Sequence, residues 1–232
     1  RGYFPVVASQ SVELVQRIGM DVPLELTARL EEVGRSQVVL RHAIIDRRDR
    51  SLVAELRVRG LWLGPTRRLA RIPDALRALA ARHAEEAGPE FQLKTPTPHY
   101  PDEGPLVHTA PRVVVHAREG LDMGTFEDPP TPTYRHTLTV RPRELDIFSH
   151  VNAATYPRYC HDARVLAHRA GAIPDAANGP FRKLAIVYDR EAILDDELAI
   201  DVAPSTDDDR GLWYTIRRAK DETVLCRARG HA

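Results

Sequence analysis

The chain has 232 residues, of which 43% are hydrophobic and 28% are charged. This composition is ordinary for a soluble globular protein, and the length is enough for one large domain or two small ones. Acidic and basic residues balance at 33 each, which excludes the global basic field typical of a nucleic-acid-binding protein. No segment approaches the ~20 consecutive apolar residues of a membrane span. We therefore expect neither a nucleic acid nor a membrane as a partner.

The front part of the chain, residues 1–88, has the pattern of long antiparallel strands followed by a helix. Apolar and polar residues alternate over most of three segments, as in half-buried strands; these segments are 22–33, 36–46 and 51–63. Residues 72–87 then carry a proline near their start and apolar residues three or four positions apart. This spacing predicts an amphipathic helix that packs one face against a sheet.

Proline marks the boundary between two domains. Nine of the 18 prolines lie between Pro89 and Pro132. Because proline lacks the backbone N–H donor, this segment cannot form a regular helix or a central strand. We predict a proline-rich linker at 89–132, in which the apolar run "RVVVH" at 112–116 could form one strand. The domains are then 1–88 and 133–232.

The back part, residues 133–232, predicts one long helix and four strands. From Tyr156 to Ala170, residues with apolar or small side chains recur every three or four positions, which predicts a helix with one buried stripe. Pro157 fits the first turn of this helix, where its missing N–H costs little, and Gly171 is a suitable stop. The strands are predicted at 183–191, 196–203, 211–219 and 223–229.

The two cysteines, Cys160 and Cys226, fall in the predicted helix and in the last predicted strand. Their spacing fits neither a disulfide framework nor a metal site. We interpret both as buried side chains of a protein in a reducing compartment, which favours the cytoplasm. The sequence predicts no metal site.

The front and back parts share a pattern. The segments that begin at Val12 and at Val187 resemble each other, and each leads into two further strands joined by a turn. The repeat predicts one α+β unit, a helix with an antiparallel sheet, used twice. The front part has no equivalent helix before its strands, so we expect that upstream residues exist and are missing from this chain.

Three polar residues, Asp146, His150 and Asn152, precede the long helix in the segment "DIFSHVNAATY" at 146–156. From the residues alone, two interpretations stay open. Asp and Asn commonly form the turn and the N-cap that start a helix. A carboxylate and an imidazole so close in sequence could also perform general acid–base catalysis.

This segment resembles the D-x-x-x-H-V-N-N-x-x-Y motif of hotdog-fold thioesterases, of both the 4-hydroxybenzoyl-CoA type and the acyl-[acyl carrier protein] type. Two further segments, "TRRLARIP" at 66–73 and "VYDREAILDDEL" at 187–198, are similar to stretches of the plant-type acyl-carrier-protein thioesterases. The resemblance implies an α+β double hotdog, in which each antiparallel sheet wraps around a long helix. The N-terminal hotdog would lack its first strand and helix in this chain. A homodimer of double hotdogs stays open.

The resemblance also implies the residues of the active site. Asp146 matches a carboxylate that acts as general base or nucleophile, and Glu191 matches a glutamate proposed as base; we rank Asp146 slightly ahead. His150 and Asn152 would orient water or bind the thioester carbonyl, and backbone N–H groups at 152–155 would form an oxyanion site. The residues expected to contact the substrate are Phe148, Ala153, Tyr156 and Tyr159.

The sequence departs from the motif at positions expected to affect activity. Phe148 stands where plant-type enzymes have an asparagine, and Ala153 stands where "HVNN" has its second asparagine. His161 stands where a glutamate is common in the helix. These three positions are expected to decide the substrate and whether the chain retains activity.

We therefore expect a thioesterase that hydrolyses an acyl-CoA or acyl-carrier-protein thioester by carboxylate-assisted attack, without a metal or an organic cofactor. Two alternatives stay open: a non-catalytic protein that binds acyl thioesters, and a hotdog enzyme of polyketide or other secondary metabolism that releases or dehydrates an acyl chain. The sequence contains no G-x-S-x-G nucleophile elbow, no Gly-rich phosphate loop and no zinc-ligand spacing.

Overall fold

The computed structural model describes residues 3–19, 21–87 and 129–232. The chain divides into two compact units, Arg1–Pro111 (unit 1) and Arg112–Ala232 (unit 2). Most of the predicted linker at 89–132 lies outside the described residues, as does all of the run "RVVVH" at 112–116.

Unit 1 contains a four-stranded antiparallel sheet in the order β2-β3-β4-β1. Its elements are β1 (Phe4–Leu14), β2 (Leu24–Val33), β3 (Gln37–Asp46), β4 (Leu52–Leu63) and helix α1 (Asp74–Ala87). The three predicted strands and the helix are all present. Strand β1 was not predicted, because a bulge between Val7 and Ser9 interrupts the alternation of apolar and polar residues.

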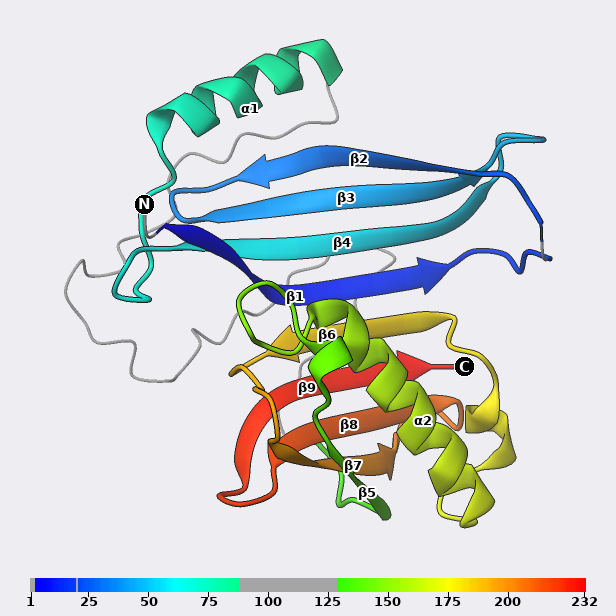
Figure 1. Ribbon diagram of the computed structural model, residues 1–232. Helices are drawn as coiled ribbons and strands as arrows, with labels where there is room; N and C mark the ends of the chain where they lie inside the picture. The colour runs from blue at the N-terminus through cyan, green and yellow to red at the C-terminus, as the bar shows by residue number, and fades with distance from the viewer. Residues whose placement is uncertain (1–2, 20, 88–128) are drawn as a thin grey trace. The chain divides into compact units, whose positions relative to one another are not determined.

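Helix α1 lies beside β2 (Figure 1) and covers a small core. Val33, Ile72 and Ala80 are buried there and pack against partly buried neighbours. The apolar stripe predicted for this helix is covered only in part, since Leu76 and Leu79 are exposed to solvent.

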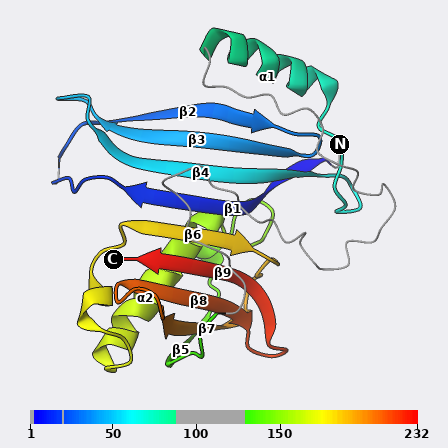
Figure 2. The same ribbon diagram turned by 180° about the vertical axis from the view of Figure 1, so that it is seen from behind.

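Unit 2 combines a five-stranded antiparallel sheet with one long helix. The sheet order is β6-β9-β8-β7-β5, and helix α2 (Tyr156–Arg169) lies across one face of it, as the two opposite views show (Figures 1 and 2). The strands are β5 (Tyr134–Thr139), β6 (Lys183–Tyr188), β7 (Glu197–Pro204), β8 (Gly211–Arg218) and β9 (Thr223–His231).

The predicted helix and the four predicted strands of the back part are confirmed, and β5 is added at the edge. The sequence of β5, "YRHTLT", is mostly polar, and the strand pairs only with β7 at the edge of the sheet. It was not predicted because its apolar residues are too few to show the pattern of a strand. The arrangement of a long helix followed by four antiparallel strands fits the hotdog unit that the resemblance implied.

The core of unit 2 lies between α2 and the sheet. The helix contributes small side chains at its centre, and Cys160, Ala163 and Ala167 have no exposed surface. Leu198 and Ile216 of the sheet are also completely buried. Small residues let the helix approach the strands closely. This packing holds the start of α2 against the sheet, together with the short 3₁₀ turn η2 (Ala153–Thr155) that leads into it.

Candidate active site

The polar residues that precede α2 are held in a closed turn. The main-chain N–H of Asp146 donates to the carbonyl of His150 at 2.8 Å, and that of Ser149 donates to the carbonyl of Asp146 at 3.1 Å. The Asp146 carboxylate accepts the N–H groups of Phe148 at 2.8 Å and His150 at 3.3 Å through Oδ1. Ser149 has a φ of 64°, the left-handed conformation that lets so short a turn close. Asp146 therefore fixes the main chain that carries His150.

The structure brings His150 together with Glu191, which lies in the loop after β6. His150 Nε2 lies 3.0 Å from Glu191 Oε2, and the two side chains are 18% and 43% exposed. Main-chain contacts join the two segments: His150 pairs with Ile193 as an isolated bridge, and the N–H of Val151 donates to the carbonyl of Ala192 at 2.9 Å. The result is a His150–Glu191 pair within reach of solvent, in the manner of a base and the group that orients it.

A buried carboxylate that the sequence did not indicate, Glu144, anchors the turn to α2. It accepts the Arg141 N–H at 2.9 Å, the Tyr159 O–H at 2.8 Å and an Arg158 N–H at 2.5 Å, and its main-chain carbonyl accepts the Asn152 N–H at 2.8 Å. Burial opposes ionisation of Glu144, but these N–H and O–H donors and the Arg158 charge hold its pKa below the usual value. Burial, reinforced by the carboxylate, raises the pKa of Tyr159.

The loop that carries Glu191 has its own anchor, Arg218 of β8. Its Nε contacts both oxygens of Asp196 at 3.1 and 3.0 Å, and its Nη2 donates to the main-chain carbonyl of Glu191 at 3.2 Å. Asp196 in turn accepts the N–H of Ile193 at 3.1 Å. No sequence signal pointed to Arg218 or Asp196, because their roles depend on contacts between distant segments.

Asn152 caps the start of the helical segment. Its Oδ1 accepts the N–H of Ala154 at 2.9 Å, and its main-chain carbonyl accepts the N–H of Thr155 at 2.8 Å. The turn-and-cap interpretation of Asn152 therefore describes the structure. Three of the N–H groups expected in the oxyanion site already have acceptors, because those of Ala154 and Thr155 donate to Asn152 and that of Asn152 donates to the Glu144 carbonyl.

Of the residues expected to contact the substrate, Tyr156 and Tyr159 are buried and Phe148 is exposed. Tyr156 is buried, with its ring edge-to-face against those of Tyr159 at 5.8 Å and Tyr188 at 5.0 Å between centroids. The Tyr188 O–H donates to the carbonyl of Ala153 at 3.0 Å and ties β6 to the helix start. Phe148 is exposed on the turn.

His161 is exposed on α2, where its Nδ1 lies 2.9 Å from Nη2 of the buried Arg164. The guanidinium of Arg164 stacks 4.5 Å from the centre of the Phe181 ring. His161 lies in the second turn of α2. The contact described for His161 is therefore with a residue of its own helix.

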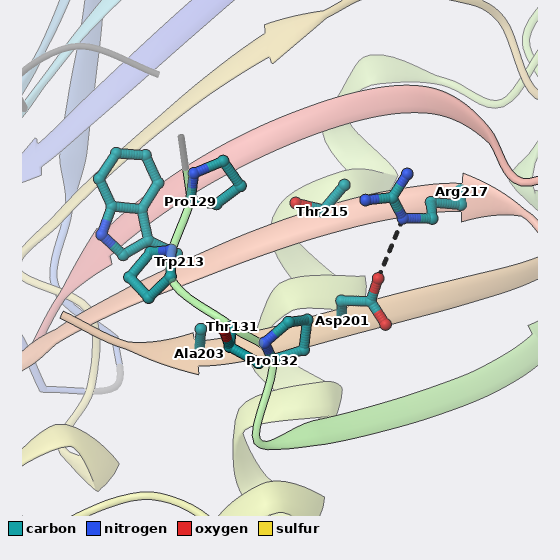
Figure 3. Close-up of a pocket in the computed structure, with 9 residues that line it drawn as sticks. Pro129, Thr131, Pro132, Asp201, Ala203, Trp213, Thr215 and Arg217 are labelled. Atoms are coloured by element: carbon teal, nitrogen blue, oxygen red, sulfur yellow. Dashed lines mark hydrogen bonds and ion pairs between the residues drawn. The ribbon is translucent and has the colours of Figure 1, made fainter. Parts of the chain in front are cut away.

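A pocket of about 180 Å³ lies on the other face of the unit 2 sheet, away from α2 (Figure 3). It is lined by residues 129–132 and by side chains of β7 and β8, among them Trp213. Asp201 at its floor is buried and receives hydrogen bonds from Arg135 at 2.6 Å and Arg217 at 3.0 Å. None of the predicted site residues lines this pocket.

The described residues contain neither a cluster of metal ligands nor a membrane-spanning helix. In residues 3–19, 21–87 and 129–232, no three His, Cys, Asp or Glu side chains gather in a way that could hold a metal ion. Within the same ranges, no helix combines the length and the apolar character needed to cross a membrane.

Comparison with solved structures identifies the fold. A protein from Lactobacillus plantarum, provisionally assigned as an oleoyl thioesterase, matches with a TM-score of 0.67 and 16% identity over 99% of this chain and 75% of its own. The 12:0-ACP thioesterase from Umbellularia californica matches with a TM-score of 0.66 and 18% identity over 100% of this chain and 75% of its own. A MaoC-like dehydratase from Phytophthora capsici matches with a TM-score of 0.51 and 11% identity over 98% and 72%.

The chain therefore has the fold of the hotdog thioesterases, which confirms the resemblance at the level of structure. No family model matches the sequence, and comparison with curated proteins finds no significant match. Because a thioesterase and a dehydratase both share this fold, the fold alone does not choose the reaction. That choice depends on the chemistry of the site.

Proposed function

We propose that this protein hydrolyses an acyl thioester, carried by CoA or by an acyl carrier protein. The observation that carries the proposal is the 3.0 Å contact between His150 Nε2 and Glu191 Oε2, placed beside the start of α2 in a hotdog unit. Such a pair can take a proton from water and return it to a leaving group. Water attack on a thioester requires both transfers.

The reaction follows from this geometry. The His150–Glu191 pair removes a proton from a water molecule, whose oxygen then attacks the thioester carbonyl. The tetrahedral intermediate collapses, the C–S bond breaks, and the sulfur leaves as a thiol with the proton that the pair had taken up. The products are a carboxylic acid and a free thiol, and no further reactant is consumed. The arrangement favours Glu191 over Asp146 as the base, because the Asp146 carboxylate holds the turn.

The developing oxyanion would be stabilised at the start of the helical segment. Asn152 Oδ1 is fixed by the N–H of Ala154, which leaves the side-chain amide nitrogen of Asn152 as a donor in a defined orientation. The positive end of the helix dipole acts in the same direction. Tyr156 and Tyr159 are then part of the support of the site rather than its chemistry.

We extend the proposal to the architecture, the compartment and the cofactor requirement of the protein. Unit 1 would correspond to the first hotdog of a double hotdog, with unit 2 as the second. Both cysteines are free and buried, which suits a reducing compartment such as the cytoplasm. The reaction needs no organic cofactor.

The test is release of thiol from a panel of acyl-CoA and acyl-carrier-protein thioesters, followed with a chromogenic thiol reagent. We expect turnover by the unmodified protein and a fall in kcat of about 10²- to 10⁴-fold in Glu191→Gln, the range typical of a lost general base. Asp195→Asn is the matched control, because it changes an exposed carboxylate in the same loop. It should retain full turnover.

Two results would contradict the proposal in different ways. A wild-type protein that releases no thiol from any substrate of the panel, yet binds these substrates, is a non-catalytic acyl-thioester-binding protein. The exposed Phe148, in place of the asparagine of plant-type enzymes, is the residue that favours this rival. Full turnover in Glu191→Gln would instead leave the reaction standing and remove the His150–Glu191 pair from it.

A further inference from the structure

The pocket on the face of the unit 2 sheet away from α2, which we call the outer pocket, contains hydrogen-bond donors with no acceptor among the described residues. Thr215 lines it and is only 5% exposed, and its hydroxyl makes no hydrogen bond within residues 3–19, 21–87 and 129–232. Arg217 donates through Nε to Asp201 at 3.0 Å and through Nη1 to the main-chain carbonyl of Glu222 at 3.5 Å, and in the same ranges its Nη2 group has no acceptor. Because buried polar groups are normally hydrogen-bonded, these two donors indicate where an acceptor would bind.

The alternation of β8 places these donors in a row with an aromatic ring. Trp213, Thr215 and Arg217 are two positions apart and lie on the same side of the strand (Figure 3), as side chains i, i+2 and i+4 of a strand do. The indole lies at one end of the row, the guanidinium at the other, and the hydroxyl between them. A ligand that fits this row has a flat apolar part against the indole and an acceptor group at the hydroxyl and the guanidinium.

The size of the outer pocket limits its ligand to a small molecule. Its volume of about 180 Å³ corresponds to about six water molecules, which is room for one ring and a short polar group. Three prolines, Pro129, Pro130 and Pro132, add apolar surface to the lining. The pocket can be reached from solvent, because Thr131 and Pro132 are exposed and the side chain of Arg217 is 27% exposed.

The charges around the outer pocket favour an anion. Asp201 is buried and is already paired with two guanidinium groups, those of Arg135 and Arg217. Glu222 lies 3.3 Å from Arg135, and Arg229 stacks 4.8 Å from the centre of the indole ring that lines the pocket. Three arginines therefore surround two carboxylates, and one negative charge on a ligand would balance them.

We propose that the outer pocket binds a small aromatic carboxylate. The carboxylate accepts hydrogen bonds from the Thr215 hydroxyl and from Nη2 of Arg217, and the ring lies against the indole of Trp213 and the prolines of 129–132. Charge-assisted hydrogen bonds and contacts between flat apolar groups both contribute to the affinity. None of the residues that line the pocket belongs to the proposed active site, so the inference does not rest on the proposed function.

The experiment titrates four small molecules into the unmodified protein and follows binding by ligand-observed NMR. Benzoate has both the ring and the charge. Benzamide lacks the charge, cyclohexanecarboxylate lacks the flat ring, and acetate lacks the apolar part. We expect benzoate to bind with a Kd of about 1 mM, as suits so small a ligand, and the other three to bind at least tenfold more weakly.

Two variants locate the binding. Thr215→Val removes the hydroxyl and keeps the shape of the side chain, and Arg217→Gln removes the guanidinium. We expect the Kd of benzoate to rise about tenfold or more in each, as the loss of a hydrogen bond to a charged group implies. Thr139→Val, at an exposed threonine of β5 in the same sheet, is the matched control and should bind as the unmodified protein does. Circular dichroism melts verify that each variant is folded.

Four results would overturn the inference. They are the absence of saturable benzoate binding, equal affinity for benzamide and benzoate, and an unchanged Kd in both Thr215→Val and Arg217→Gln. The fourth is a loss of benzoate binding in Glu191→Gln with full binding in Thr215→Val, because benzoate would then occupy the proposed active site. Thioester turnover has no part in these outcomes, so the inference and the proposed function can fail separately.

Discussion

In the reaction proposed above, Asp146 holds the turn that carries His150 and does not itself react. Its Oδ1 accepts two main-chain N–H groups of the turn, and an asparagine side chain offers an oxygen at the same position. We therefore expect Asp146→Asn to keep kcat within about threefold of the wild-type value, whereas Asp146→Ala should lower it by about ten- to a hundredfold through misplacement of His150. Steady-state kinetics with dodecanoyl-CoA measure both variants.

A different result would restore Asp146 as the base. If Asp146→Asn reduces kcat as severely as Glu191→Gln does, the charge at position 146 is required and the turn alone does not explain it. Circular dichroism melts of both Asp146 variants serve as the control, because a turn variant that remains folded should melt near the wild-type temperature.

At the scale of single residues, the sequence predicted the local part of the site. Asp146, His150 and Asn152 lie within seven positions, so their proximity followed from the chain itself. Glu191 was implied by resemblance alone, and its contact with His150 depends on pairing between segments 41 positions apart. Glu144 was missed because its burial depends on contacts with Arg158 and Tyr159, which lie in α2.

Among elements, strands were predicted well where burial made their pattern strong. The strands β7, β8 and β9 carry apolar residues inward at nearly every second position, and all were expected within two residues of their observed limits. Strands β1 and β5 were missed because a bulge disrupts one and polar residues dominate the other. Both strands form because they pair with a neighbouring strand, and local sequence propensity does not predict such pairing.

The link between the 3₁₀ turn η1 (Pro142–Glu144) and α2 should be acid-sensitive. The folded-state pKa of Glu144 is lowered, so its contribution to stability is fully present above the ordinary value of 4.5 and is lost as the pH falls through the lowered value. Urea unfolding at about pH 7 and about pH 4 should show a smaller decrease of the unfolding free energy in Glu144→Gln than in the wild-type protein.

The same residue should be costly to remove even at neutral pH. Glu144→Ala leaves the Tyr159 O–H and the Arg141 N–H without their acceptor, which we expect to lower the free energy of unfolding by about 2–3 kcal/mol. Glu197→Gln, at an exposed carboxylate on β7, is the control for the loss of a charge. If the free energy of unfolding depends on pH identically in Glu144→Gln and in the wild-type protein, these contacts do not lower the pKa of Glu144, and the acid-sensitivity prediction is wrong.

At the scale of the whole molecule, the two units carry different natural probes. Trp62 lies in unit 1 and Trp213 in unit 2, while Cys160 and Cys226 both lie in the core of unit 2. Burial raises the pKa of both thiols, which leaves little reactive thiolate in the folded state. Each unit can therefore be followed separately during unfolding.

We expect both thiols to be inert toward a thiol reagent in the native protein and to react as unit 2 unfolds. In Trp62→Phe, the remaining fluorescence reports Trp213, and its urea midpoint should coincide with that of thiol labelling. Thiol labelling at a lower urea concentration than the Trp213 transition would contradict a single cooperative core in unit 2 and would show that α2 separates from the sheet first.

The turns that carry His150 and Glu191 are fixed by main-chain hydrogen bonds, and this has a consequence for diversification. Positions 147, 193 and 194 contribute backbone to these turns, while their side chains remain outside the hydrogen bonds. Natural drift or a directed library could therefore exchange these side chains freely while the reacting groups keep their geometry. Under the proposed function, the side chains that could change with a new acyl group are therefore separate from the hydrogen bonds that must stay constant, and a library at three codons would test this.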